Sequence, residues 1–107
     1  MTGELRFGMT FRQGSDWPSI VEHVERYEAL GLDTMWIPDH FVFPWQPSSP
    51  WLECFSVLAA LAARTSRIRL GTLVTHSVYR NPAILARRSA SEWTASTRRS
   101  RLWTGCC

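Results

Sequence analysis

Apolar and polar residues alternate along the first 86 positions with two different periods. Three segments show either strict alternation or a short apolar run, and they predict strands over residues 5–11, 34–38 and 68–75. The second segment is a run of apolar residues that suits a buried strand, and it stops at Pro38 because proline cannot donate to a sheet ladder.

Helical spacing of apolar residues fills the stretches between these strands. The predicted helices end at Gly31, run over residues 52–64, and open at Ala83. Ser15 or Asp16 is suited to cap the first helix, and Asn81 the third. Residues 41–51, rich in proline, serine and aromatic residues, predict a loop. The order β-α-β-α-β-α predicts an α/β fold with right-handed parallel crossovers, and both an open sheet and a closed barrel fit it.

Composition sets outer limits on the fold. A chain of 107 residues, 45% of them hydrophobic, makes one modest domain or part of a larger one, and is too hydrophobic for a disordered chain. No apolar run approaches the ~18 residues of a transmembrane helix, and no signal-peptide pattern is visible. The cysteines, Cys54, Cys106 and Cys107, form neither a disulfide framework nor a metal-binding spacing, so we expect a cytoplasmic protein without a metal site.

The formal net charge of +3 is unevenly distributed. Residues 1–86 hold seven Arg and eight acidic residues, whereas residues 87–107 hold five Arg and only Glu92. Because the excess belongs to the tail, the body has no basic surface and we expect no nucleic-acid partner. All twelve cationic side chains are Arg, which is typical of a GC-rich genome.

The first candidate site is Asp39-His40, at the carboxyl end of the second predicted strand. Active sites of α/β folds lie at this end of the strands. A carboxylate beside an imidazole suits proton transfer or the anchoring of a cofactor. The alternative is that Asp39 caps a local turn and that His40 is a partly buried polar residue.

The second candidate site runs from Gly71 to His76, at the end of the third predicted strand. Gly71 permits a ligand to approach the backbone closely, and Thr72 and Thr75 place two hydroxyls beside an imidazole. The alternative is a glycine at a bulge with threonines chosen for strand propensity. Since the neighbouring strand ends in Asp39-His40, the two segments strengthen each other as one predicted site.

Other residues with reactive or aromatic side chains receive structural interpretations. His23 lies on the polar side of a helix, and Cys54 is expected to be a small buried hydrophobe. Trp36, Trp45 and Trp51 stand among proline and apolar residues, so we expect them to line an apolar pocket or pack in the core instead of stacking on bases. The chain has no glycine-rich phosphate-binding motif.

Taken together, these segments resemble the luciferase-like flavin- and deazaflavin-dependent oxidoreductases. The resemblance covers about residues 4–87 and rests on four stretches, R-F-G near the start, Y-E-A-L-G-L-D-T-M-W-I-P-D-H-F (27–41), L-A-A-L-A-A-R-T-S-R-I-R-L-G-T-L-V-T (58–75) and R-N-P-A-I-L-A-R (80–87). It implies a TIM barrel that binds coenzyme F-420 or reduced FMN and acts on a small organic substrate, by hydride transfer or by monooxygenation. The W-x-P-D-H-F stretch and the arginine-only composition suit the F-420 branch.

The resemblance also implies roles for individual residues. His40 matches a residue that helps with proton transfer, and Asp39 matches one that orients it or contacts the cofactor ring. A non-proline cis peptide is implied near Leu73-Val74, whereas no role carries over to His76, where relatives often have proline. The wall facing the ring would consist of Gly71, Thr72, Leu73, Val74 and Thr75.

The resemblance stops after Arg87, and a TIM barrel needs eight β/α units in ~250 residues where three are present. Residues 1–87 are therefore predicted to be the N-terminal segment of a barrel. Residues 88–107 show neither period and are predicted to be a disordered tail without a fourth strand. Codons can be chosen for Glu92 to Thr104 so that a shifted frame encodes an amphipathic helix, which favours an out-of-frame origin.

Two functions fit this reading of the sequence. One is a residual oxidoreductase site for a small-molecule substrate, although we expect the 107-residue chain to be inactive alone. The other is an inactive truncated product, or a small module that self-associates through open sheet edges. Binding of FMN or F-420 by the purified chain distinguishes the two.

Overall fold

The computed structural model describes residues 3–43 and 45–86, and the backbone of residues 102–106. The elements follow the order β1 (Gly8–Thr10), α1 (Trp17–Ala29), β2 (Thr34–Ile37), α2 (Cys54–Arg64), β3 (Arg69–Thr75), the 3-10 helix η1 (Ser77–Tyr79) and β4 (Leu102–Cys106). Residues 82–86 are also helical, and the Asn81 side chain caps them by accepting from the amide of Ala83 at 2.9 Å. The predicted α/β order is confirmed.

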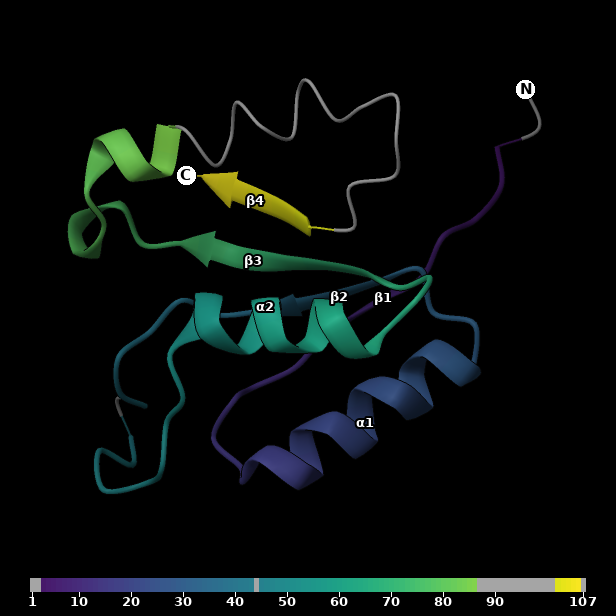
Figure 1. Ribbon diagram of the computed structural model, residues 1–107, viewed down its shortest axis with the longest axis horizontal. Coiled ribbons are helices and arrows are strands. Elements are labelled where there is room, and N and C mark those ends of the chain that lie inside the picture. The colour runs from purple at the N-terminus through teal and green to yellow at the C-terminus, as the bar shows by residue number, and fades with distance from the viewer. Residues whose placement is uncertain (1–2, 44, 87–101, 107) are drawn as a thin grey trace.

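The strands form one parallel sheet in the order β1-β2-β3-β4, with α1 and α2 on the same side of it (Figure 1). This arrangement is that of the wall of a TIM barrel, in which the helices surround the strands. In the part of the chain that the structure describes, β1 pairs with β2 alone, so the sheet does not close.

β1 is shorter than the strand predicted over residues 5–11. It pairs with β2 only at Gly8–Thr10, and the residues on either side add single backbone hydrogen bonds. The amide of Asp33 donates to the Phe7 carbonyl, and the amide of Phe11 donates to the Trp36 carbonyl, each at 2.8 Å. Side-chain alternation predicted the extended backbone, whereas the length of the neighbouring strand limits the ladder.

The ends of α1 show how local sequence sets a helix. Of the two predicted caps, Asp16 is the one used: its carboxylate accepts from the amide of Ser19 at 2.8 Å. Pro18 lies in the first turn, where its missing N–H costs nothing. Gly31 has φ +88, a conformation that side chains with a Cβ rarely adopt, so the chain turns there toward β2.

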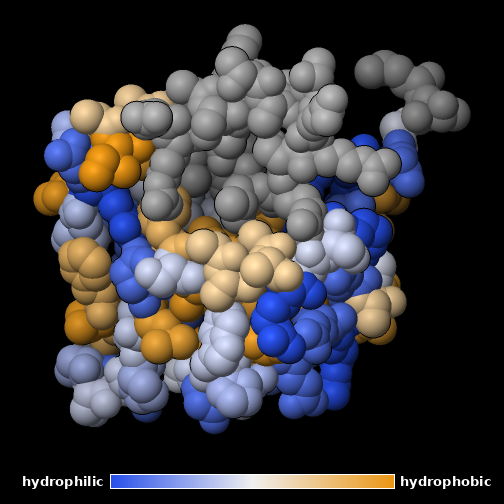
Figure 2. Space-filling view, in the orientation of Figure 1, coloured by the Kyte–Doolittle hydropathy of each residue, from blue (hydrophilic) through white to orange (hydrophobic). Residues whose placement is uncertain are grey.

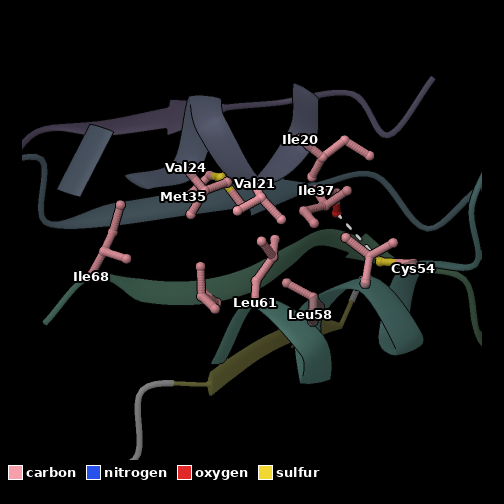
Figure 3. Close-up of a cluster of buried hydrophobic side chains, with 11 residues drawn as sticks. Ile20, Val21, Val24, Met35, Ile37, Cys54, Leu58, Leu61 and Ile68 are labelled. Atoms are coloured by element: carbon pink, nitrogen blue, oxygen red, sulfur yellow. Dashed lines mark hydrogen bonds between the residues drawn. The ribbon is translucent and has the colours of Figure 1, made fainter. Parts of the chain in front are cut away.

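The hydrophobic core lies between the sheet and the two helices (Figure 3). Met35 and Ile37 of β2, with Ile68 and Leu70 at β3, are fully buried against the helices. The helices contribute Ile20, Val21, Val24, Cys54, Val57, Leu58 and Leu61. Full burial of an aliphatic side chain contributes roughly 1.5–3 kcal/mol to the stability of the fold. This buried layer therefore stabilises the strands whose ends form the predicted site.

Glu28, at the end of α1, holds the beginning of β3. Its carboxylate accepts from the backbone amides of Ser66, Arg67 and Ile68. The Arg67 side chain in turn donates to the carbonyls of Glu28 and Leu32, both at 2.9 Å. These hydrogen bonds connect helix and sheet at the amino end of the strands, away from the predicted site.

The tail requires a correction, because it was expected to be disordered and to lack a fourth strand. Leu102–Cys106 form β4, which runs parallel to β3 and pairs with it from Leu70 to Thr75 across a register shift. The outer edge of β3 presents unpaired backbone groups that favour an added strand whatever the side-chain period. The expectation of disorder over 88–101 falls on residues outside the described part of the chain.

The two ends of the molecule differ in surface character. Hydrophilic residues gather over α1 and the end of α2, while apolar residues gather toward the carboxyl ends of the strands (Figure 2). Large exposed hydrophobic residues of that second region include Phe41, Val42, Trp45, Val78 and Tyr79. None of the described helices is long and apolar enough to cross a membrane.

Candidate functional site

The two predicted site segments meet at the carboxyl ends of β2 and β3. Asp39 follows β2 and is 2% exposed, and one of its carboxylate oxygens accepts from the backbone amide of His76 at 3.0 Å. The structure therefore brings the Asp-His segment and the end of β3 into direct contact, as their places in the sequence predicted.

Asp39 has a second partner that the sequence analysis did not identify, the guanidinium of Arg80. Its Nε donates to Asp39 at 3.2 Å, and its Nη2 donates to the other carboxylate oxygen. The same Nη2 donates to Glu53 at 2.7 Å, and the guanidinium lies over the Phe55 ring, 4.3 Å from its centre. Arg80 thus contacts the end of β2 and the start of α2 at once.

Glu53 is the cap of α2 as well as a partner of Arg80. Its carboxylate accepts from the amides of Phe55 and Ser56 and from the Ser56 hydroxyl. Burial acts to raise the pKa of Glu53, but the hydrogen bonds from Ser56 and Arg80 outweigh it and lower this pKa to about 2. Partial burial acts to lower the pKa of Arg80, and the two carboxylates raise it overall. Glu53 and Arg80 are therefore both ionised at neutral pH.

His40 differs sharply from its neighbour Asp39. Its imidazole is exposed, and among the described residues it has no side-chain hydrogen bond. Its backbone is held, however, because the indole Nε1 of Trp51 donates to the His40 carbonyl at 2.6 Å. Neither alternative considered for these residues is found, since Asp39 caps no turn and His40 is not buried.

The end of β3 combines a buried polar pair with an exposed apolar pair. The hydroxyls of Thr72 and Thr75 lie 2.5 Å apart, and both residues are buried. Leu73 and Val74 are 48% and 38% exposed. The peptide bond between them is cis, at the position that the family resemblance implied.

Aromatic side chains surround these strand ends. The His76 ring stacks on Tyr79 with centres 3.9 Å apart, and Tyr79 stacks on Phe41 at 4.3 Å. The Nδ1 atom of His76 is buried and has no hydrogen-bond partner in the described structure. Stacking thus joins the residue after His40 to the segment that follows β3.

The tryptophans behave only partly as expected. Trp51 stacks on Phe43 with ring centres 5.6 Å apart, and Trp36 is half-buried beside Gly8, where an added Cβ would lie 3.2 Å from its indole nitrogen. Trp45 is 81% exposed, so the expectation that it packs in the core or lines a pocket is wrong for this structure. It lies in the loop before α2, where its ring meets Phe43 edge-on with centres 5.4 Å apart.

The remaining reactive side chains have structural surroundings. Cys54 is 1% exposed, and burial, together with the nearby Asp39 carboxylate, raises the pKa of its thiol to about 12. This confirms the interpretation of Cys54 as a buried hydrophobe. His23 is exposed, with its Nδ1 2.6 Å from the Ser19 carbonyl oxygen, which confirms that it lies at the surface.

Arg80 and Glu53 are the site residues that sequence reasoning missed. Arg80 stands directly before Asn81-Pro82, and the sequence indicated it only as part of a stretch that resembles the family. It lies 41 positions from Asp39 and 27 from Glu53, and no local periodicity connects residues at such distances. The available signal is an arginine a few residues after a predicted strand, together with a carboxylate at the end of the neighbouring strand.

Comparisons with known proteins agree on one family. The model of the family described as luciferase-like monooxygenase matches residues 5–106. Among curated proteins, the F420-dependent glucose-6-phosphate dehydrogenase of Amycolatopsis mediterranei is 38% identical over a match of 76 residues, and the match covers 67% of this chain and 22% of that protein. The 5,10-methylenetetrahydromethanopterin reductase of Methanolobus tindarius is 33% identical over 82 residues, 77% of this chain and 23% of that protein.

Solved structures show the same fold. The coenzyme F420-dependent tetrahydromethanopterin reductase from Methanopyrus kandleri superposes with a TM-score of 0.67 at 27% identity, over 83% of this chain and 23% of that one. An F420-dependent secondary alcohol dehydrogenase superposes with a TM-score of 0.71 at 22% identity, over 94% of this chain and 31% of that one. The chain spans about a fifth of the length of the curated relatives it matches.

Proposed function

Because the chain belongs to the luciferase-like monooxygenase family, we propose that it supplies part of the active site of an oxidoreductase acting on a small organic substrate. The proposed reaction is hydride transfer with coenzyme F-420, which several of the curated relatives use according to their names. One observation carries this proposal: an exposed imidazole and an exposed apolar pair lie at the carboxyl ends of adjacent strands, above a well-packed core.

The residues at the end of β3 fit a flat cofactor ring. Leu73 and Val74 form an exposed apolar platform at the end of β3, and a ring system would cover this platform. Thr72 and Thr75 satisfy each other's hydroxyls beneath the surface, so they support this platform without competing for solvent. F-420 or FMN, when bound, supplies a ring that accepts or donates two electrons.

His40 is suited to hold or release a proton at an imidazole nitrogen facing the site. A histidine side chain carries two ring nitrogens, of which one can accept a proton while the other donates one. The hydrogen bond from Trp51 fixes the His40 backbone. The His40 ring is exposed, so both of its nitrogens are accessible to a ligand. The burial of Asp39 and its contacts with Arg80 and His76 support an orienting role for this carboxylate.

Monooxygenation with reduced FMN is the second candidate reaction, and the description of the matching family favours it. The same His40 and the same apolar platform would serve both reactions, because FMN and F-420 each present a flat tricyclic ring. A direct comparison of the two cofactors separates these candidates.

A role without catalysis, as a small self-associating module, competes with both reactions. It is favoured by the open edge of β1 and by the exposed apolar residues Leu5, Phe7 and Met9 in and just before that strand.

The test is a titration of the purified 107-residue chain with F-420 and with FMN, followed by cofactor fluorescence. We expect saturable binding with preference for F-420, and loss of binding in Leu73→Asp, which places a charge on the apolar platform. Leu5→Asp is the matched control, since Leu5 is 81% exposed near β1 and outside the proposed site. Absence of binding to both cofactors, or equal loss in the two variants, would contradict the proposal.

A further inference from the structure

Residues 39–41 are held on both sides of His40 by one segment, residues 76–80. Asp39 accepts from the His76 amide and from Arg80, while the ring of Phe41 stacks on Tyr79 at 4.3 Å. His40 stands between these two anchored residues with its own side chain exposed. Whatever fixes residues 76–80 therefore also fixes the place of the His40 imidazole.

Arg80 is the residue of that segment with the most extensive polar contacts. Its guanidinium donates to both oxygens of Asp39 and to Glu53, and it covers the ring of Phe55. The Arg80 side chain is 21% exposed, and that of Asp39 1%. Charged hydrogen bonds in such a protected place are stronger than those of surface ion pairs.

We infer that Arg80 is a positioning residue, which bridges Asp39 and Glu53 and thereby keeps the His40 imidazole in place beyond the carboxyl end of β2. This inference rests on the proposed function, because only that function gives His40 a ligand on which to act. It adds to that function a residue outside the Asp-His pair, and it assigns Arg80 no contact with substrate or cofactor.

The shape of the guanidinium, and not its charge alone, is required by this geometry. A planar fork can donate from Nε and Nη2 to one carboxylate, reach a second carboxylate and lie flat on a ring. A lysine ammonium carries the same charge but offers one donor centre, so it cannot reproduce these contacts together. Arg80→Lys therefore separates positioning from charge compensation.

The experiment compares Arg80→Lys with the wild-type chain by hydrogen exchange and mass spectrometry. We expect amide exchange in segments 39–52 and 76–80 to accelerate about tenfold, the effect of losing one charged hydrogen bond, with less than about twofold change in α1 and β3. Arg64→Lys is the matched control, because Arg64 pairs with Glu25 at 3.3 Å on the exposed helical surface. Uniform acceleration across all segments, or none in residues 39–52, would overturn the inference.

A second variant, Glu53→Gln, keeps an oxygen to cap α2 and removes the charge that faces Arg80. We expect a smaller acceleration in segments 39–52 and 76–80 and in the first turn of α2, whose amides pair with both Glu53 oxygens. This variant decides the matter if Arg80→Lys does not fold. Acceleration that spreads to the core of α1, or no acceleration at all, would count against Arg80 as a positioning residue.

Cofactor titration then tests whether the positioning by Arg80 affects cofactor binding. We expect the Kd for F-420 or FMN to rise about tenfold in Arg80→Lys and to stay within about twofold in Arg64→Lys. A wild-type chain that binds neither cofactor contradicts the proposed function, and the exchange pattern then decides the positioning role alone. Accelerated exchange with an unchanged Kd in Arg80→Lys would contradict a positioning role for this site.

Discussion

Asp39 and His40 are adjacent in sequence, yet their side chains have opposite surroundings. The Asp39 side chain is 1% exposed and pairs with Arg80, whereas His40 is exposed. We expect Asp39→Ala to lower the free energy of unfolding by about 2–3 kcal/mol, because it removes the acceptor of charged hydrogen bonds at a buried position. His40→Ala should change it by less than about 0.5 kcal/mol. Urea unfolding followed by circular dichroism measures both, and equal losses would contradict this assignment.

His40 is expected to matter for turnover instead. In a full-length relative with the same Asp-His pair, replacing the histidine that corresponds to His40 by alanine should lower turnover by ~10²–10⁴, the range of a general acid or base. The fold should survive, since the imidazole is exposed. A variant that unfolds but keeps normal activity in the folded fraction would overturn the role proposed for His40.

Glu53 gives stability a dependence on acidic pH. Its pKa of about 2 in the folded chain lies below the ordinary value of 4.5, so its contribution to stability is present above pH 4.5 and is lost as the pH falls toward 2. We expect the urea midpoint to fall across this range, and less steeply in Glu53→Gln. Part of the slope should remain, because the pKa values of Asp16 and Glu28 are also lowered. A hydrogen bond from Ser19 lowers the pKa of Asp16, and at Glu28 burial raises the pKa but the backbone hydrogen bonds outweigh it. An unchanged slope in the variant would exclude Glu53 as a source.

At the scale of elements, helix α1 and strand β3 depend on each other through Glu28. Its carboxylate accepts from three backbone amides just before β3, those of Ser66, Arg67 and Ile68. We expect Glu28→Ala to lower the free energy of unfolding by about 1–3 kcal/mol. Glu25→Ala removes only an exposed ion pair with Arg64 and should cost less than about 1 kcal/mol. Chemical denaturation compares the two, and similar losses would refute the connecting role of Glu28.

At the scale of the whole molecule, the sheet has an open edge. Within the described residues β1 pairs on one side only, and Leu5, Phe7 and Met9 are 81%, 63% and 41% exposed. We expect the purified chain to self-associate through this edge and to melt over a broad temperature range. Sedimentation velocity and calorimetry test this, and a compact monomer with a sharp transition would contradict it.

The origin of residues 88–107 is a separate prediction about the molecule. The sequence predicts that a shifted reading frame over Glu92 to Thr104 encodes an amphipathic helix. We expect the shifted reading frame of the coding DNA to encode that amphipathic helix. A coding sequence in which the native frame matches intact relatives would refute this origin. The family model matches residues 5–106, so the expectation that the resemblance stops after Arg87 is wrong, and this match counts against the out-of-frame origin.

Much of the fold follows from the sequence itself. The bounds of α1, β2, α2 and β3 lie within a few residues of their predicted ranges. Asp16 caps the start of α1 and Gly31 follows its end, as local rules require. Helical and strand periods, caps and turns act over a few neighbouring residues, so the chain carries them without knowledge of its partners. Asp39-His40 and the end of β3 could be identified for the same reason, because strand ends are visible in the pattern.

Only the tertiary structure decided which side chains serve this site and in what state. It buried Asp39 and exposed His40, it placed Arg80 between Asp39 and Glu53, and it added β4 where no periodicity predicted a strand. Arg80 and Asp39 are 41 positions apart. The segments that follow β2 and β3 must therefore pack together before these two side chains can form an ion pair. Such contacts depend on where whole elements lie in space. Local sequence determines the elements, and the packing of those elements determines the chemistry at their ends.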